Sequence, residues 1–255
     1  CIMPTWTRHL YEHNELAISK GESTGYKTLF KFGFNPDING TEETIWAQGG
    51  NYPWPDASFT AYVVSDAAAD ANGNTGSNKV RVEGLDANYN EQSVEVELNG
   101  TSPVAVAGTW IRVNRAFVTL AGSGGTSAGT IHVQNVDGSV VYANLGLGNQ
   151  THVAAYTVPA GYTLYIDDIN FTAALSQANK FVTAKFVSRD FGSNVFRSRF
   201  INVLQSAQLI SKFEYPQKFE EKTDMECRAL SDTINNAVGA SFQGVLIKND
   251  PTGNV

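Results

Sequence analysis

Apolar and polar residues alternate in short runs along most of the chain, which is the pattern of β-strands with one buried face. Residues 79–85 alternate apolar with charged or small side chains, and residues 93–98 do the same. A third run covers residues 237–248, and one of its faces would carry Val238, Ala240, Phe242, Gly244 and Leu246. The pattern predicts a strand at each of the three places, with that face buried.

Turn residues separate these strands from others. Residues 86–90 and the pair Asp137-Gly138 each lie between two β-rich runs, which predicts a hairpin at both places. Pro159-Ala160-Gly161 predicts a further turn. Other predicted strands cover residues 28–34, 58–64, 110–120, 130–136, 140–145, 180–188, 196–204, 209–215 and 224–230. So many short strands, with turns between them, predict an all-β chain folded as an antiparallel β-sandwich or jelly roll.

The chain divides into three parts by pattern. Residues 1–25 lack the strand pattern and permit a short helix or two turns, so they are interpreted as an arm that packs on its own domain or on a neighbouring subunit. Residues 26–148 are expected to form a first β-sandwich region and residues 149–255 a second, jelly-roll-like region. The boundary near residues 148–150 is neither long nor Pro-rich, which favours a seam over a free linker.

Composition and charge exclude some classes of partner. A chain of 255 residues is long enough to bury a core without a metal or a disulfide. Residues 1–175 hold 17 acidic and 8 basic groups, whereas residues 176–255 hold 8 and 10, for a total charge of −7. Duplex nucleic acid is bound by clustered Lys and Arg, so we expect no nucleic-acid partner. No run of about 18 apolar residues exists, so we expect no membrane partner either.

The two cysteines do not form a disulfide framework. Cys1 could be the lipid-modified residue of a bacterial lipoprotein, but the polar linker of such an anchor is absent, and we favour a chain trimmed at its start. Cys227 alternates with Met225 and Ala229 on one face of a predicted strand, which indicates a small core residue. The redox compartment is therefore not readable from the cysteines.

Two patterns could hold a metal. Residues 9–13 match the H-x-x-E-H motif of one group of zinc peptidases, but no further helices follow to support such a site. Asp-x-Asn segments at residues 37–39, 70–74 and 86–90 offer alternating oxygen donors that suit calcium. Asp and Asn also favour turns through local hydrogen bonds. We interpret the first pattern as part of the arm and the Asp-x-Asn segments as turns, with calcium as the alternative for the latter.

No combination of residues predicts catalysis. Asp167 and Asp168 are adjacent in a predicted strand, so their side chains should point to opposite faces and could not flank one glycosidic bond. His132 and His152 have no nucleophilic partner at a known spacing. Motifs for an esterase nucleophile, a phosphate loop or a dinucleotide are absent. We therefore expect no enzymatic activity and no cofactor, with a glycan depolymerase as the least favoured alternative.

Aromatic side chains are the strongest candidates for contact with a partner or a glycan. One group surrounds Gly49-Gly50 and could stack on sugars if its rings are exposed. The alternative is an aromatic loop packed on its own sandwich. A second group lies in the arm. The candidate contact residues are Trp6, His9, Tyr11, Trp46, Tyr52 and Trp54.

Several longer motifs resemble those of a family of tailed-bacteriophage virion proteins. The chain carries KFGFNPD at residues 31–37, IWAQGG at 45–50 and GLDANYNE at 84–91. Later segments that share the resemblance are LNGT at 98–101, NRAF at 114–117, YTVPAG at 156–161 and EKTD at 221–224. One departure is Phe34, where the family often has Arg.

The resemblance implies a virion structural protein with no active-site residues to carry over. The first expectation is a capsid-associated protein, such as a decoration protein, head fibre or knob, that docks through its N-terminal arm. Its partners would be other virion proteins, and we expect a homo-oligomer, with a trimer as one candidate state. The alternative is a tail-associated receptor-binding module that recognises a glycan of the host surface.

Overall fold

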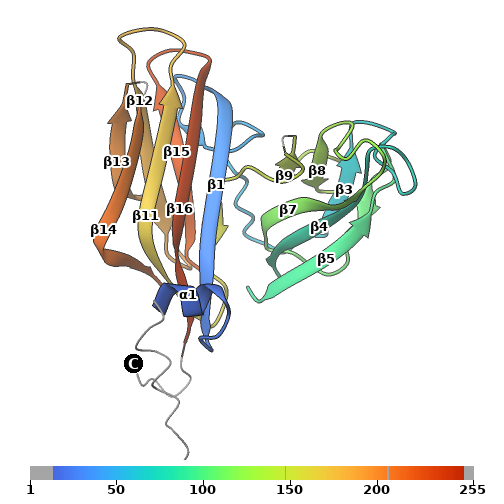
Figure 1. Ribbon diagram of the computed structural model, residues 1–255, viewed down its shortest axis with the longest axis horizontal. Helices are drawn as coiled ribbons and strands as arrows, with labels where there is room; N and C mark the ends of the chain where they lie inside the picture. Colours follow the sequence, from blue (N-terminus) through green and yellow to red (C-terminus); the bar gives the residue numbers. More distant parts are fainter. Residues whose placement is uncertain (1–13, 147, 206, 250–255) are drawn as a thin grey trace, which may run out of the picture.

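Two antiparallel sheets form the larger β unit (Figure 1). The computed structural model describes residues 14–146, 148–205 and 207–249. The first sheet has the order β1 (Tyr26–Ile38), β16 (Asn236–Lys248), β11 (Tyr162–Ala174) and β14 (Gln208–Phe219). The second has the order β10 (Ala155–Thr157), β15 (Asp224–Ser231), β12 (Val182–Arg189) and β13 (Arg197–Leu204), with β2 (Glu43–Thr44) also paired to β15.

The pairing of these strands is that of a jelly roll. In chain order the outermost strands pair with each other, β1 with β16, and successive pairs are nested inside: β10 with β15, β11 with β14, and β12 with β13. Such nesting arises when one long antiparallel hairpin is wound into two facing sheets. The predicted all-β fold, an antiparallel sandwich of jelly-roll type, is confirmed.

A smaller β unit is inserted into the jelly roll between β2 and β10 (Figure 1). The hairpins predicted at residues 86–90 and at Asp137-Gly138 are confirmed, because β4 pairs with β5 and β8 with β9. One sheet of this inserted unit has the order β6 (Val104–Ala105), β3 (Tyr62–Ser65), β8 (Ile131–Gln134) and β9 (Val141–Leu145). The other has the order β5 (Glu91–Glu97), β4 (Ser77–Leu85) and β7 (Arg112–Ala121).

The predicted division into residues 26–148 and 149–255 places β1 in the wrong region, because β1 belongs to the jelly roll with the end of the chain. β1 pairs with β16 from Tyr26 opposite Ile247 to Ile38 opposite Asn236, so it belongs to the same sheet as the end of the chain. Alternation along a strand shows which face is buried but not which strand lies beside it. The segments that leave and re-enter the jelly roll also touch, because Trp46 and Val153 form an isolated bridge.

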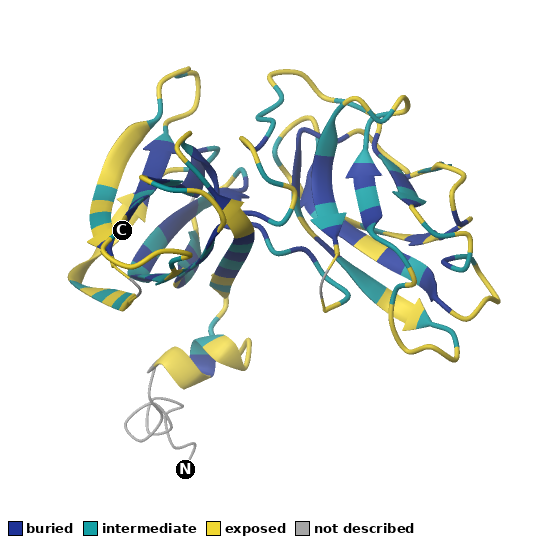
Figure 2. Cartoon of the chain, turned by 90° about the horizontal axis from the view of Figure 1, so that it is seen from above, coloured by how far each residue is buried: buried dark blue, intermediate teal, exposed yellow. Residues whose placement is uncertain are grey.

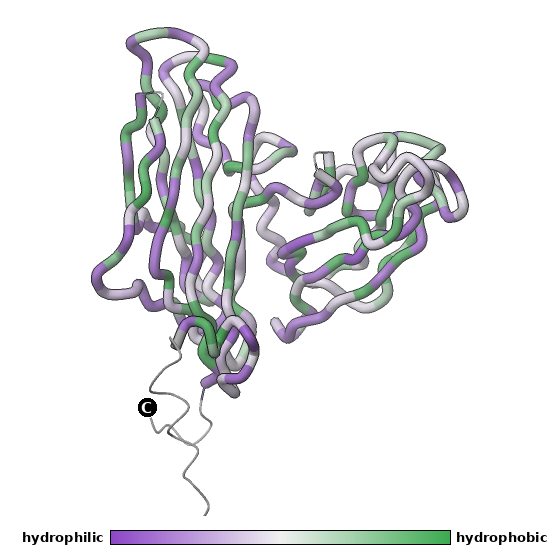
Figure 3. Tube along the Cα trace, viewed as in Figure 1, coloured by the Kyte–Doolittle hydropathy of each residue, from purple (hydrophilic) through white to green (hydrophobic). Residues whose placement is uncertain are grey.

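Each β unit has its own apolar core. Phe171, Phe186 and Phe242 fill the jelly roll, and Trp110 is fully buried in the inserted unit. Apolar and polar residues alternate along the long strands (Figure 3), and the buried ones gather inside each unit (Figure 2). Cys227 is a free thiol buried in the jelly-roll core, as predicted.

The N-terminal arm is described only from residue 14. It contains α1 (Asn14–Ser19), a helix of six residues whose Ala17 is buried, so of the two alternatives for the arm, a short helix or two turns, the described part has the helix. The candidate contact residues Trp6, His9 and Tyr11 lie outside the described residues, as does the whole H-x-x-E-H motif at residues 9–13. Within the described part of the chain, no helix has the length and apolar character needed to cross a bilayer.

Candidate functional site

The two β units meet at a junction that contains buried charges. Arg112 is the first residue of β7 in the inserted unit, and its side chain is only 3% exposed. Its Nε and Nη2 donate hydrogen bonds to Oδ1 and Oδ2 of Asp224, on β15 of the jelly roll, at 2.9 and 2.8 Å. Two parallel bonds between a guanidinium and a carboxylate fix both distance and angle. This ion pair therefore sets the orientation of one unit against the other.

Asp224 accepts further bonds that complete its coordination. Arg189 Nε donates to its Oδ2 at 2.8 Å, and Thr157 Oγ1 donates to its Oδ1 at 2.5 Å. Arg112 uses its remaining nitrogen, Nη1, to donate to the carbonyl oxygen of Pro55 at 2.6 Å. Burial alone would lower the pKa of Arg112, but the hydrogen bond and charge of Asp224 outweigh it, so the pKa is raised. Arg112 thus stays charged although its side chain is buried.

A second buried carboxylate holds the segment that leaves the jelly roll. Glu226 lies two residues after Asp224 on β15 and is fully buried. It accepts hydrogen bonds from Thr44 Oγ1 at 2.5 Å, Trp54 Nε1 at 3.0 Å and Arg228 Nε at 2.9 Å. Burial raises the pKa of Glu226, although Arg228, Thr44 and Trp54 act in the opposite direction. The segment that leaves the jelly roll, which contains Thr44 and Trp54, is therefore hydrogen-bonded to β15, the strand that also binds Arg112 of the inserted unit.

The aromatic cluster predicted to contact a partner or a glycan packs into this junction instead. Trp46 and Tyr52 are 2% and 4% exposed, and their rings meet edge to face at 5.4 Å. The Tyr52 hydroxyl donates to the carbonyl oxygen of Val113 at 3.0 Å. Trp54 is partly buried beside Tyr52. Because rings without accessible surface cannot stack on a sugar, the prediction of an exposed contact surface is wrong for Trp46 and Tyr52.

Glycine lets the chain cross itself closely at this point. Gly33 lies on β1 beneath both connecting segments. A Cβ at Gly33 would lie 2.2 Å from the carbonyl oxygen of Ile45 and 2.4 Å from the amide nitrogen of Ala154. No side chain fits at such distances, so the close approach of these segments requires glycine.

Lys31 adds a contact between the two units near the ion pair. It is buried on β1 of the jelly roll, and its Nζ donates to the carbonyl oxygen of Asn114 on β7 at 2.5 Å. Burial lowers the pKa of Lys31 to about 7, with a smaller contribution from the charge of Arg115 and an opposing one from Glu83. The amine is thus partly neutral near pH 7 and still able to donate its hydrogen bond.

The lowered pKa of Lys31 predicts a pH dependence of stability. The folded chain releases this proton at about pH 7, whereas the unfolded chain keeps it up to the ordinary value of 10.5. The unfolded state therefore binds more protons between these values, so the free energy of unfolding rises with pH there. From about pH 7.5 to about pH 9 we expect a gain of roughly 1–2 kcal/mol in urea unfolding. Lys31→Met should remove this gain, and equal slopes in both proteins would contradict the assignment.

Six of the seven segments that carry the phage-protein resemblance have contacts at the junction, whereas residues 98–101 bond within the inserted unit. Lys31 and Asn114 form the contact just described, and the Ala160 amide donates to the carbonyl oxygen of Tyr89 at 2.8 Å. Asp224 carries the central carboxylate. The motif segments with contacts here cover residues 31–37, 45–50, 84–91, 114–117, 156–161 and 221–224.

The Asp-x-Asn segments form turns, and two of them also hold neighbouring loops in place through hydrogen bonds. Both carboxylate oxygens of Asp70 accept backbone or hydroxyl hydrogen bonds within the inserted unit. Asp86 caps the amides of Asn88 and Asn90 in its own turn, and Asp37 accepts from the Asn235 amide at 3.1 Å. Among the described residues, no group of three or more His, Cys, Asp or Glu side chains could hold a metal ion.

The adjacent acids and the two histidines are partly buried. Burial and the charge of Asp168 raise the pKa of Asp167, and burial lowers the pKa of His152. A bulge in β11 at Asp167 leaves Asp167 and Asp168 both outside the buried positions Ile166 and Ile169, so the expectation of opposite faces is wrong. Asp168 accepts a hydrogen bond from Gln243 at 2.6 Å. His132 Nε2 lies 3.3 Å from Asp66, and His152 packs 5.3 Å from the Phe32 ring.

Comparison with known proteins adds little to this description. No protein-family model and no curated protein sequence matches the chain. Among solved structures, infectious bursal disease virus of the Gx strain is similar over 89% of this chain and 74% of that chain, with 10% identity and a TM-score of 0.26. T=1 particles derived from the same virus are similar over 89% and 79%, with 9% identity and a TM-score of 0.11. At these scores the likeness assigns no function.

Proposed function

We propose that this chain is a structural protein of a bacteriophage virion, associated with the capsid and docked there through its N-terminal arm. Support for the proposal comes from the resemblance of the sequence motifs to those of phage virion proteins, together with the contacts that six of these motifs make at the junction between the units. A component of a repeating shell must present its surfaces at a constant angle. Arg112 and Asp224 meet that need, because a buried bidentate pair resists both rotation and separation.

The edge of the jelly roll opposite the inserted unit supports association with other subunits. β13 and β14 end their respective sheets on the side away from that unit (Figure 1). Exposed strand edges with apolar side chains are sites where another protein binds. We expect neighbouring copies of this chain to pack here, as a homo-oligomer for which a trimer is one candidate. The exposed apolar side chains of these two strands are Ile201, Val203, Ile210 and Tyr215.

Docking through the arm can be tested with truncated chains. The chain without residues 1–13 should no longer co-sediment with capsids that lack this protein, whereas the full chain should. A chain without residues 250–255 is the matched control, because it also loses a terminal segment outside the described residues, and it should bind like the full chain. Equal binding of all three chains would remove the arm from the proposal.

Cryo-electron microscopy of the intact virion tests the location. Density for this chain on the capsid shell would support the capsid-associated role. Density at the tail tip or fibres would favour the alternative, a receptor-binding module that recognises a host glycan. Virions that contain no copy of the chain would overturn both.

A further inference from the structure

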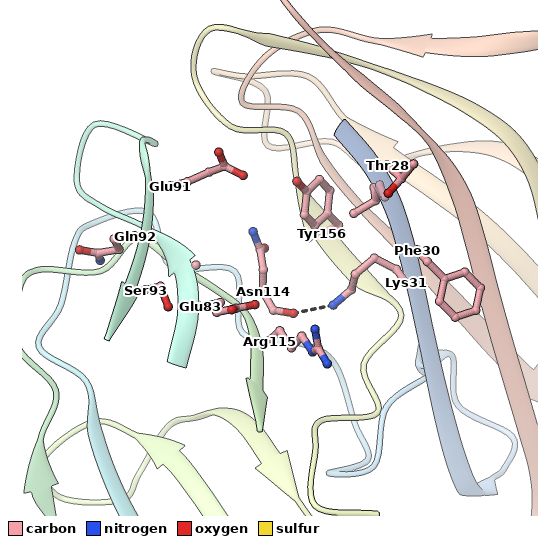
Figure 4. A pocket seen from close by; sticks show the side chains of 12 residues that line it. Thr28, Phe30, Lys31, Glu83, Glu91, Gln92, Ser93, Asn114, Arg115 and Tyr156 are labelled. Atoms are coloured by element: carbon pink, nitrogen blue, oxygen red, sulfur yellow. Dashed lines mark hydrogen bonds between the residues drawn. The ribbon is translucent and has the colours of Figure 1, made fainter. Parts of the chain in front are cut away.

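The jelly roll has two lateral edges, and described residues cover only one of them. The inserted unit lies beside β1 and β10, and Lys31 on β1 bonds to Asn114 across that contact (Figure 4). The other edge is formed by β13 and β14, each of which ends its sheet (Figure 1). No described segment pairs with the outer side of either strand. The backbone at this edge is therefore available to a strand of another chain.

β14 carries the features that block pairing at an edge. Its register against β11 shifts so that residues 213–216 have no partner there. This bulge contains Glu214 and Pro216, and Lys212 precedes it. Bulges, charges and proline keep edge strands from pairing with other chains. β14 is therefore a poor partner for another strand.

β13 has none of these features over its second half. Residues 200–204 read FINVL, with no charge and no proline. Ile201 and Val203 are 53% and 66% exposed and lie on the outer face of the sheet. An edge strand that is apolar, uncharged and exposed is the kind that pairs with another chain.

The hydrogen bonds of the sheet show which peptide groups of β13 are free. The Asp232 amide donates to the carbonyl oxygen of Phe181, just before β12, so odd-numbered residues of β12 bond to β15. Because the bonded side alternates along an antiparallel strand, even-numbered residues of β12 bond to β13. Over residues 182–186 these face even-numbered residues of β13. The peptide groups of Ile201 and Val203 therefore point to the open side.

The sequence of this segment is complementary to itself in antiparallel pairing. When Asn202 lies opposite Asn202 of a second copy, Ile201 faces Val203 of that copy, and the free peptide groups of both residues meet. The cross-strand pairs on the outer face are then apolar, which stabilises the pairing. Arg199 faces Gln205, so no like charges lie opposite each other.

Asn202, at the centre of this register, has an amide that lacks a partner. Its Nδ2 atom is buried and makes no hydrogen bond in the described part of the chain. Buried amides in native proteins are nearly always paired. The two Asn202 residues would form a non-hydrogen-bonded pair, in which facing side chains approach most closely. Their amides can then bond to each other, as Asn side chains do in other stacked strands.

The basic groups beside β13 are neutralised within the chain. Asp190 pairs with Arg197 and Arg199 at the start of the strand. Lys185, on the adjacent strand β12, pairs with Glu42. These ion pairs leave little net charge to repel a second copy.

We propose that two copies of this chain pair through β13, antiparallel and about a two-fold axis at Asn202. The inference rests on the association of copies at this edge in the proposed function, and it adds the strand and the register. The pairing joins the β13 sheets of both copies into one continuous sheet. A two-fold contact closes a dimer, so a trimer would need a different surface.

Sedimentation equilibrium of the full chain over a range of concentrations tests the pairing. The wild type should dimerise, and Val203→Lys should raise the dissociation constant of the dimer at least about ten-fold, because lysine on an edge strand prevents pairing. Ile210→Lys is the matched control, since Ile210 is 60% exposed on β14, and it should leave the constant unchanged. Thermal unfolding establishes that each variant is folded.

Cysteine crosslinking tests the register. The background is Cys1→Ser, in which the buried Cys227 is the remaining native thiol. Asn202→Cys should give a disulfide-linked dimer on oxidation, because facing Cα atoms in a non-hydrogen-bonded pair are about 4.5 Å apart. Val203→Cys is the control, since the Cα atoms at position 203 of the two copies would be about 8 Å apart, too far for a disulfide.

The contrary results separate this inference from the proposed function. A chain that stays monomeric at every concentration would overturn the inference, while cryo-electron microscopy would still decide its place in the virion. A dimer that survives Val203→Lys, or that Ile210→Lys disrupts equally, would overturn pairing through β13 without affecting the proposed role in the virion. Equal crosslinking of Asn202→Cys and Val203→Cys, or none in either, would overturn the register.

Discussion

Asp224→Asn is expected to lower the free energy of unfolding by about 3–5 kcal/mol, since it removes the charge that balances a buried arginine. Arg112 and Arg189 would both remain beside an uncharged amide, and Arg112 has almost no access to solvent. The amide would also present a donor where the carboxylate accepts hydrogen bonds from both arginines and from Thr157. Urea unfolding followed by fluorescence of the junction tryptophans measures the loss.

The chain supplies a close control for this change. Asp190 also pairs with two arginines, Arg197 and Arg199, but all three side chains are substantially exposed. Exposed ion pairs contribute about 0–1 kcal/mol, so Asp190→Asn should be nearly neutral. Similar losses in Asp190→Asn and Asp224→Asn would show that burial of the pair does not determine its contribution.

The same variant separates stability from geometry. If the Arg112–Asp224 pair fixes the angle between the units, small-angle X-ray scattering of folded Asp224→Asn should show a broader distribution of distances than the wild type. An unchanged scattering curve would mean that the remaining contacts hold the orientation, among them the Lys31 hydrogen bond and the aromatic packing around Trp46.

Local features of the fold were predictable because they depend on neighbouring residues. Alternation in residues 237–248 identified the buried face of β16, and Asp137-Gly138 identified the hairpin of β8 and β9. Both signals are set within a few residues of the chain. The bulge at Asp167 was missed, because an extra residue in one strand depends on how its partners pair.

Pairing between distant segments was not predictable in the same way. The motif at residues 31–37 marks a strand, but nothing in it shows that β16 is its neighbour or that a complete β unit is inserted after β2. Arg112 and Asp224 could have drawn attention as charges beside apolar runs. Their partnership still depends on the fold, since the sequence offers many acids for each arginine.

The candidate site shows the limit of composition most clearly. Trp46 and Tyr52 have the residue types of a sugar-binding surface, yet each is buried by the connecting segments that cross Gly33. Exposure decides whether a side chain can contact a partner, and it is a property of the folded chain.

Asp70→Ala is expected to lower the free energy of unfolding by roughly 3–5 kcal/mol, because several buried donors would lose their acceptor at once. The carboxylate of Asp70 is fully buried in the inserted unit. It accepts from the amides of Ser77, Ala128 and Gly129 at 2.7, 2.8 and 3.0 Å, and from a hydroxyl. Burial acts to raise the pKa of Asp70, but these hydrogen bonds outweigh it, so the pKa is lowered.

Asp86→Ala is the control for Asp70→Ala, because Asp86 also accepts several hydrogen bonds but lies in an exposed turn. Water can replace the carboxylate there, so the expected loss is within about 1 kcal/mol. Calcium should leave the melting temperature of the wild type unchanged, since protein donors already occupy both oxygens of Asp70. A higher melting temperature with calcium, abolished by Asp70→Ala, would instead show that this loop opens to bind the ion.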